Sequence, residues 1–185
     1  DSEKNKKIGK KFGAEVPFLR SKKASKSNSM EEDVLEDIRL KLIKENQDLP
    51  DCVLWLRPTH PLRDLNIFKK AYLKFKKHKE SVCIVSRTDQ RIFISKHNKL
   101  IALNLNFKKK SMIRRQDCTQ AYKIFHGEFF IFPKKYNKKF LGENIRYEVQ
   151  NDICNIDIDT KEEINLYQKI IKLDKKKYEK FLHTT

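Results

Sequence analysis

The sequence predicts an α/β fold, a three-layer sandwich in which helices cover both faces of a mostly parallel sheet. Short apolar runs that suit strands alternate along the chain with longer amphipathic stretches that suit helices. Four consecutive apolar residues, Val53–Leu56, are typical of a strand buried on both faces, as in a parallel sheet. A hydrophobic content of 38%, with 12 Phe in 185 residues, can fill the core of one domain.

In the first half of the chain, local signals mark the ends of the expected elements. Residues 1–12 predict a helix, because Gly13 stands where a left-handed C-terminal residue belongs. Ser29-Met-Glu-Glu32 is a capping box that predicts a helix to about residue 45. Further elements are expected as strands at 15–19, 52–56 and 81–86 and a helix at 65–77.

In the second half, the pattern is less regular. Residues 87–110 predict a short β-excursion around His97-Asn98, and residues 111–122 are polar and irregular. Thr160-Lys-Glu-Glu163 is a second capping box, which predicts a long C-terminal helix. Between these segments we expect strands at 128–132 and 145–149, the latter at an edge, and a short helix at 133–141.

The segment Leu56-Arg-Pro-Thr-His-Pro-Leu-Arg63 is the first candidate site. Its two prolines forbid a central strand from continuing, so a strand ends in a rigid turn that carries Thr59. Ligands of open α/β sheets bind beyond the carboxyl ends of strands. Arg57 and Arg63 there favour an anionic ligand, since a guanidinium pairs well with carboxylate or phosphate. An ordinary strand-to-helix turn is the alternative.

Two further segments carry candidate chemistry. Asp157 and Asp159 share one face of an extended chain just before a helix, which suits Mg²⁺ held together with a substrate phosphate. Alternatively, Asp159 or Thr160 only caps that helix. Arg115 and Gln116 follow another arginine in an irregular stretch, and they suit a carboxylate or a sugar. A solvated basic loop is the alternative reading there.

The composition excludes several classes of protein. No apolar run approaches the roughly 18 residues of a membrane span, and the polar N-terminus does not resemble a signal peptide, so we expect a cytoplasmic protein. The net charge of +17 favours anionic partners, but the lysines are spread along the chain as in solvated helix faces. A basic nucleic-acid-binding module is an alternative, which the core-like spacing of the aromatic residues disfavours. The four cysteines form no CxxC, and no metal-ligand spacing joins them to the histidines.

Taken in order, these segments resemble a known family. Gly13-Ala-Glu-Val-Pro-Phe-Leu-Arg20, the turn ending at Arg63, Arg114-Arg-Gln-Asp117 followed by Ala121-Tyr122, and Ile156-Asp-Ile-Asp-Thr160 are similar to the acylneuraminate cytidylyltransferases, or CMP-sialic acid synthetases. The resemblance runs from Asp1 to about Ile171.

The resemblance implies a Rossmann-like nucleotide-sugar transferase fold over residues 1–185. The implied reaction joins CTP to a nine-carbon α-keto acid sugar, sialic acid or a relative, for cell-surface polysaccharide biosynthesis. Asp157 and Asp159 match the family's catalytic Mg²⁺ aspartates, and Arg115 matches a sugar-binding arginine in the loop that also holds Gln116 and Tyr122. Residues 88–112 match an inserted dimerisation arm, so a homodimer is expected.

The chain also departs from the family. Its 185 residues contain no Arg-x-Gly-Ser-Lys loop for the CTP phosphates, so we expect an N-terminally incomplete or decayed copy that is inactive as written. Arg57 stands where the family usually has a glutamine that faces the sugar. His126-Gly127 replaces Asn-Gly, and His126 either hydrogen-bonds the sugar or is a turn residue. Alternatives are an enzyme for another α-keto acid sugar such as Kdo, and a non-catalytic remnant that pairs with an intact subunit.

Overall fold

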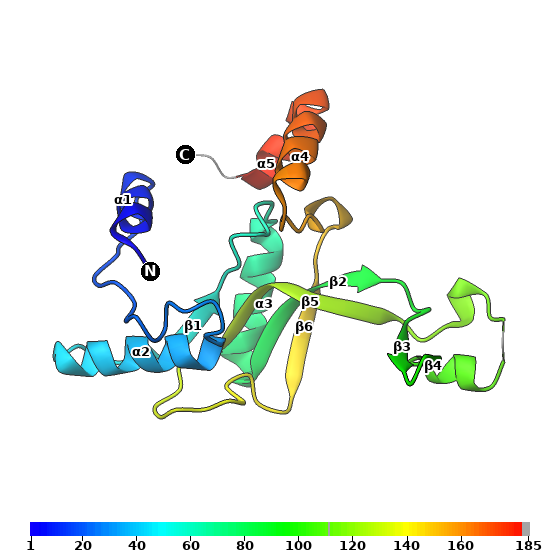
Figure 1. The fold of residues 1–185 in the computed structure, drawn as a ribbon, viewed down its shortest axis with the longest axis horizontal. Coiled ribbons are helices and arrows are strands. Elements are labelled where there is room, and N and C mark those ends of the chain that lie inside the picture. The colour runs from blue at the N-terminus through cyan, green and yellow to red at the C-terminus, as the bar shows by residue number, and fades with distance from the viewer. Residues whose placement is uncertain (111, 183–185) are drawn as a thin grey trace. The chain divides into compact units, whose positions relative to one another are not determined.

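A computed structural model describes residues 1–110 and 112–182, without the side chains of Leu105, Lys108, Phe125 and His126. It contains both α-helices and β-strands, as an α/β fold requires, but the strands between residues 81 and 149 follow one another with no α-helix among the described residues between them (Figure 1). The elements are α1 (Glu3–Lys11), α2 (Glu31–Lys44), β1 (Cys52–Trp55), α3 (Leu65–His78), β2 (Ser81–Thr88), β3 (Phe93–Lys96), β4 (Lys99–Ala102), η1 (Leu105–Lys108), η2 (Arg115–Asp117), β5 (Ala121–Ile131), β6 (Ile145–Val149), η3 (Asp152–Cys154), α4 (Lys161–Leu173) and α5 (Lys175–Leu182).

The main sheet has the strand order β1-β5-β2-β6, and β3 pairs with β4 in a separate hairpin. The prediction of a mostly parallel sheet is wrong, because β5 runs antiparallel to β2 and lies between β1 and β2. That strand is 11 residues long and takes up part of a segment that was expected to be irregular. β1 is therefore at an edge of the described sheet, and Leu54 and Leu56 are partly exposed instead of buried on both faces.

Other local predictions also need correction. Residues 15–19 form no strand and residues 133–141 form no helix. The first capping box is shifted by one residue, since the Asp33 carboxylate accepts from the backbone N–H of Met30 at 3.4 Å. The C-terminal helix is interrupted at Asp174 and gives two helices, α4 and α5. Among the described residues, no helix combines the length and apolar character needed to cross a membrane.

The chain divides into two compact units. Residues 1–53, 79–81 and 130–145 form the first unit. Here the Asp37 carboxylate of α2 accepts hydrogen bonds from the backbone of Ser21 at 3.0 Å and from Lys41 at 2.6 Å. The same Lys41 ammonium donates to the carbonyl of Leu19, so one partly buried carboxylate and its lysine fix the preceding loop against α2.

The second unit contains residues 54–78, 82–129 and the chain from 146 onward. Its core joins α3 to the sheet, and the Phe68 and Phe129 rings meet edge to face at 6.4 Å. Gly127 permits this approach, because a Cβ there would lie 3.0 Å from Cε1 of Phe68. A separate cluster of buried residues, Leu62, Cys154 and Phe181, anchors the turn after β1 to the C-terminal helices.

Candidate functional site

The turn that follows β1 is held by its own backbone and by a buried anchor. The backbone N–H of His60 donates to the carbonyl of Arg57 at 3.2 Å, and the Arg63 guanidinium donates to the same carbonyl at 3.1 Å. The Leu62 side chain of this turn is buried, and the backbone N–H of Arg63 donates to the carbonyl of Phe181 in α5 at 2.9 Å. The expected rigid turn is therefore confirmed.

The Asp-x-Asp-Thr segment lies against this turn although it is distant in sequence. The backbone N–H of Ile158 donates to the carbonyl of Thr59 at 2.9 Å. The second capping box is confirmed, with the Glu163 carboxylate accepting from the backbone N–H groups of Asp159 and Thr160 at 2.8 Å each. These bonds fix the segment at both ends, one at the turn and one at α4.

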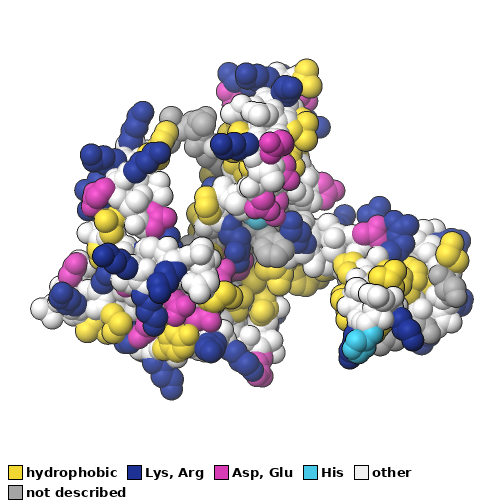
Figure 2. All heavy atoms as spheres, in the orientation of Figure 1, with side chains coloured by type: hydrophobic (Ala, Val, Ile, Leu, Met, Phe, Trp, Pro, Cys, Tyr) yellow, Lys and Arg dark blue, Asp and Glu magenta, His cyan; other side chains and the backbone are white. Residues whose placement is uncertain are grey.

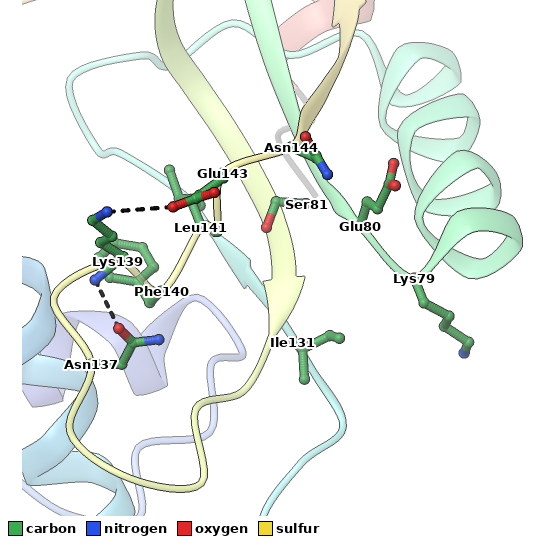
Figure 3. A pocket seen from close by; sticks show the side chains of 11 residues that line it. Lys79, Glu80, Ser81, Ile131, Asn137, Lys139, Phe140, Leu141, Glu143 and Asn144 are labelled. Carbon is green, nitrogen blue, oxygen red and sulfur yellow. Dashed lines mark hydrogen bonds and ion pairs between the residues drawn. The ribbon is translucent and has the colours of Figure 1, made fainter.

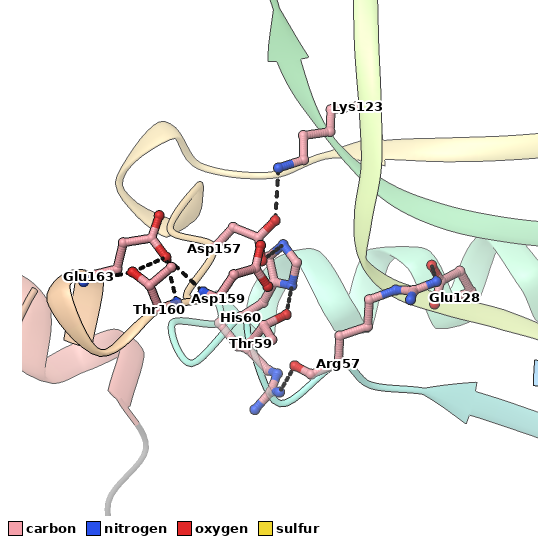
Figure 4. A network of polar contacts seen from close by, with 10 residues as sticks. Arg57, Thr59, His60, Lys123, Glu128, Asp157, Asp159, Thr160 and Glu163 are labelled. Atoms are coloured by element: carbon pink, nitrogen blue, oxygen red, sulfur yellow. Dashed lines mark hydrogen bonds and ion pairs between the residues drawn. The ribbon is translucent and has the colours of Figure 1, made fainter. Parts of the chain in front are cut away.

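Asp157 is the centre of the resulting polar network (Figure 4). One carboxylate oxygen accepts from Nζ of Lys123 at 2.9 Å, and the other lies 3.6 Å from Nε2 of His60. His60 is almost fully buried, and its Nδ1 is 3.2 Å from the hydroxyl oxygen of Thr59. The network thus joins the turn, the Asp segment and strand β5.

The electrostatics of this network favour an ionised Asp157 beside a neutral His60. Burial works to raise the pKa of Asp157, but the Lys123 hydrogen bond, His60 and Thr59 outweigh burial, and the pKa is lowered. Burial lowers the pKa of His60, and Lys123 adds to this, although Asp157 opposes the shift. The carboxylate is therefore maintained as an anion at neutral pH.

A second charged pair lies on the β5 side of the turn. Nη2 of Arg57 is 3.7 Å from Oε1 of Glu128. Figure 4 shows these two side chains beside each other. The Arg57 side chain is 31% exposed, whereas that of Glu128 is 4% exposed. Burial, followed by the Glu128 charge, raises the pKa of the opposing Cys83 thiol to about 12, so this cysteine remains protonated. Arg63 is partly buried, and burial lowers its pKa.

The other predicted site residues lie elsewhere in the second unit. Arg115 and Gln116 are exposed in η2, and none of their described contacts reaches Asp157. Tyr122 packs on Tyr147 of β6 with ring centroids 5.0 Å apart, and on a strand its side chain points away from the face of its neighbour Lys123. The prediction for His126 concerns a side chain outside those that the structure describes. The roles assigned to these residues remain predictions.

The predicted metal ligands can be tested against their surroundings. Within residues 1–110 and 112–182, no group of three or more His, Cys, Asp or Glu side chains is arranged to hold a metal ion. Mg²⁺ needs fewer protein ligands, because it commonly combines one or two carboxylates with waters and substrate phosphates. Asp159 is exposed, and Asp157 would exchange its Lys123 contact for the metal. The donor set therefore fits Mg²⁺ held jointly with a substrate.

Sequence reasoning missed Lys123 and Glu128, which contact two of the predicted residues. Both lie on β5, whose position between β1 and β2 has no local sequence signal. The sequence assigned residues 123–127 to no element and placed Glu128 at the start of the strand expected at 128–132, so neither side chain was linked to the turn. The register shift of β5 opposite Ile84 and Val85 also interrupts the alternation of faces along the strand, since Phe125 and His126 have no counterpart on β2.

Two other surface features were compared with this network. Lys and Arg side chains are spread over several elements in Figure 2, with acidic side chains between them, as expected for solvated faces. The first unit has a cavity of about 300 Å³ that includes Ser81, Asn137 and Phe140 among its lining residues (Figure 3). None of the predicted site residues lines this cavity.

Comparison with known proteins shows which proteins this chain is similar to. No family model matches the chain. Two pseudaminic acid cytidylyltransferases, from Campylobacter jejuni subsp. jejuni serotypes O:23/36 and O:2, are each 27% identical over 173 residues, covering 85% of this chain and 70% of theirs. A crystal structure of 4-diphosphocytidyl-2C-methyl-D-erythritol synthase from Anaerococcus prevotii has a TM-score of 0.60 at 13% identity, over 92% of this chain and 74% of that one, which shows a shared fold. The chain is thus similar in sequence to pseudaminic acid cytidylyltransferases, in line with the resemblance of its motifs to the CMP-sialic acid synthetases.

Proposed function

We propose that this protein transfers the cytidylyl group of CTP to a nine-carbon α-keto acid sugar, giving a CMP-sugar and pyrophosphate. The observation that carries the proposal is the bond from Ile158 to Thr59, which brings the Asp segment to the turn after β1. The pseudaminic acid cytidylyltransferases match 85% of the chain, and they support a nonulosonic acid as the acceptor.

The reaction forms a bond between the anomeric oxygen of the sugar and the α-phosphorus of CTP. The bond from that phosphorus to the pyrophosphate oxygen breaks, and the anomeric hydroxyl loses its proton. Asp157 and Asp159 would hold Mg²⁺, which when bound offsets phosphate charge and aligns the reacting groups. The Lys123 ammonium donates to Asp157 at 2.9 Å and contributes to the lowered pKa of that carboxylate.

The cations around these aspartates have separate proposed tasks. Arg63, fixed by its bond to the Arg57 carbonyl, lies at the carboxyl end of β1, where an anionic group of the substrate would bind. Arg115 would bind the carboxylate of the sugar, since a guanidinium can meet both carboxylate oxygens. Gln116, Tyr122 and His126 remain proposed sugar contacts on the strength of the resemblance alone.

The β3–β4 hairpin supports a proposed homodimer. Residues 88–112 include this hairpin, and several of its apolar side chains are exposed in the single chain. Leu100 is 75% exposed and Leu103 is 54% exposed, which is costly unless another surface covers them. Contact with a second copy of this chain would bury them.

The proposal is tested by following pyrophosphate release from CTP and Mg²⁺ with a panel of sugar acids. The protein is expressed from its complete reading frame, and the panel contains pseudaminic, N-acetylneuraminic and legionaminic acids, with Kdo as the eight-carbon comparison. Release that requires a nine-carbon acid is the expected result. Failure of every nine-carbon acid both to release pyrophosphate and to bind in calorimetric titration would sink the proposal.

A further inference from the structure

His60 is a buried polar residue that no step of the proposed reaction uses. It is 1% exposed, and its ring lies between the Thr59 hydroxyl and the Asp157 carboxylate (Figure 4). Its backbone N–H donates to the carbonyl of Arg57, and Pro61 follows it, so the backbone that carries the ring has little freedom. A ring fixed in this way is suited to hold its neighbours in place.

The two ring nitrogens of His60 face different partners. Nδ1 is 3.2 Å from the Thr59 hydroxyl, which can donate or accept a hydrogen bond and therefore suits this nitrogen with or without a hydrogen. Nε2 is 3.6 Å from Oδ1 of Asp157, which as a carboxylate oxygen can only accept. The contact between Nε2 and this anion is attractive only when Nε2 carries a hydrogen. The geometry therefore favours an Nε2–H that faces Asp157.

The other oxygen of Asp157 has a partner of a different kind. Nζ of Lys123 is 2.9 Å from Oδ2, and the Lys123 side chain is 40% exposed, whereas that of His60 is 2% exposed. An exposed lysine can leave its carboxylate at little cost, but a buried ring on a rigid turn cannot. His60 is therefore the contact that stays with Asp157 when the lysine is displaced.

We propose that His60 is a positioning residue whose Nε2–H holds the Asp157 carboxylate in the orientation that the reaction needs, while the Thr59 hydroxyl fixes the ring at its other nitrogen. This inference rests on the proposed function, because the orientation matters only if Asp157 takes part in the reaction. Removing a donor that orients a metal-binding side chain typically costs about tenfold to hundredfold in metal affinity or activity.

Two variants separate the Nε2 contact from simple filling of space. In His60→Gln, the side-chain amide nitrogen can take the place of Nε2, so the donor to Asp157 is kept. In His60→Asn, the amide ends at the place of Nδ1, from which it can reach Thr59 but not Asp157. The Mg²⁺ concentration for half-maximal rate should rise about tenfold or more for His60→Asn and stay within about threefold for His60→Gln. The KM for the sugar should stay within about twofold in both.

A second readout needs no turnover. Long-range ¹H–¹⁵N NMR of the wild type, expressed from its complete reading frame with ¹⁵N-labelled histidine, reports which ring nitrogens carry hydrogen, and the signals that His60→Gln lacks identify His60. Nε2 of His60 should carry a hydrogen. The matched control is His78→Asn, at the exposed end of α3, which should change neither the Mg²⁺ requirement nor the His60 signals.

The outcomes distinguish the inference from the function on which it rests. A protonated Nε2, with a Mg²⁺ requirement that stays near the wild-type value in His60→Gln, supports the inference, and these two results decide it even where His60→Asn does not fold. An unprotonated Nε2, or equal losses in the two variants, overturns it while the proposed function stands. A wild type that neither binds nor converts any nine-carbon acid overturns the proposed function, and the inference with it.

Discussion

Gly127→Ala tests the close approach of α3 to strand β5, which positions the neighbouring Glu128. A Cβ at residue 127 would lie 3.0 and 3.3 Å from two ring carbons of Phe68 and 3.4 Å from Cδ2 of Leu56. The Phe68 ring is itself packed edge to face on Phe129, so it has little room to move. The new methyl group therefore forces the helix and the strand apart.

The expected cost follows from these contacts. Overpacking of a core typically costs about 1–3 kcal/mol, and the loss of glycine's freedom in the unfolded chain returns about 0.4–1 kcal/mol. The free energy of unfolding should thus fall by about 1–2 kcal/mol. For a chain of this size the melting temperature should fall by about 2–8 °C.

Urea unfolding followed by circular dichroism measures this cost. Gly9→Ala in α1 is the matched control, because its Cβ would make only ordinary contacts, with Val16 at 3.4 Å and Ala14 at 3.8 Å, and alanine favours a helix. This control should be neutral or stabilising. If Gly127→Ala leaves the midpoint and slope of unfolding unchanged, Phe68 yields freely and the approach does not fix the strand.

Three further predictions concern charged residues. Asp37→Asn should lower the free energy of unfolding by about 1.5 kcal/mol at neutral pH. Burial works to raise the pKa of Asp37, but the Lys41 hydrogen bond contributes to a net lowering of that pKa, so the cost should be full above pH 3.8 and vanish as pH falls through the folded pKa. Urea unfolding over a range of pH can follow this change. Lys123→Met should raise the pKa of Asp157 toward its usual value at a cost below about 1 kcal/mol, since the pair is partly exposed, and an unchanged carboxyl titration by NMR would contradict this. Arg115→Ala should raise the KM for the sugar far more than that for CTP in steady-state assays, whereas equal changes would mean that it does not face the sugar.

Features with local signals could be predicted from the sequence. The prolines of the turn and the Thr160 capping box act through neighbouring residues, and both are confirmed. The turn and the Asp segment were joined in one site by the resemblance alone. The bond from Ile158 to Thr59 and the contact of Asp157 with His60 are what the structure adds.

The rest depends on pairings between distant residues. The antiparallel insertion of β5 has no local sequence signal, and it alone places Lys123 at Asp157 and Glu128 at Arg57. Arg57 was expected to meet an anionic ligand, and the structure shows that it already meets one within the chain. Tyr122 was assigned to the sugar loop, yet in this chain its ring packs on Tyr147.

The most direct test compares the wild type with the double variant Asp157→Asn and Asp159→Asn. Both proteins, expressed from the complete reading frame, are incubated with CTP, Mg²⁺ and pseudaminic acid, and ³¹P NMR follows the CMP-sugar phosphodiester. The account predicts that the wild type forms this signal together with pyrophosphate and that the double variant forms neither. Equal turnover by the two proteins, or no CMP-sugar from the wild type with any nine-carbon acid, would contradict it.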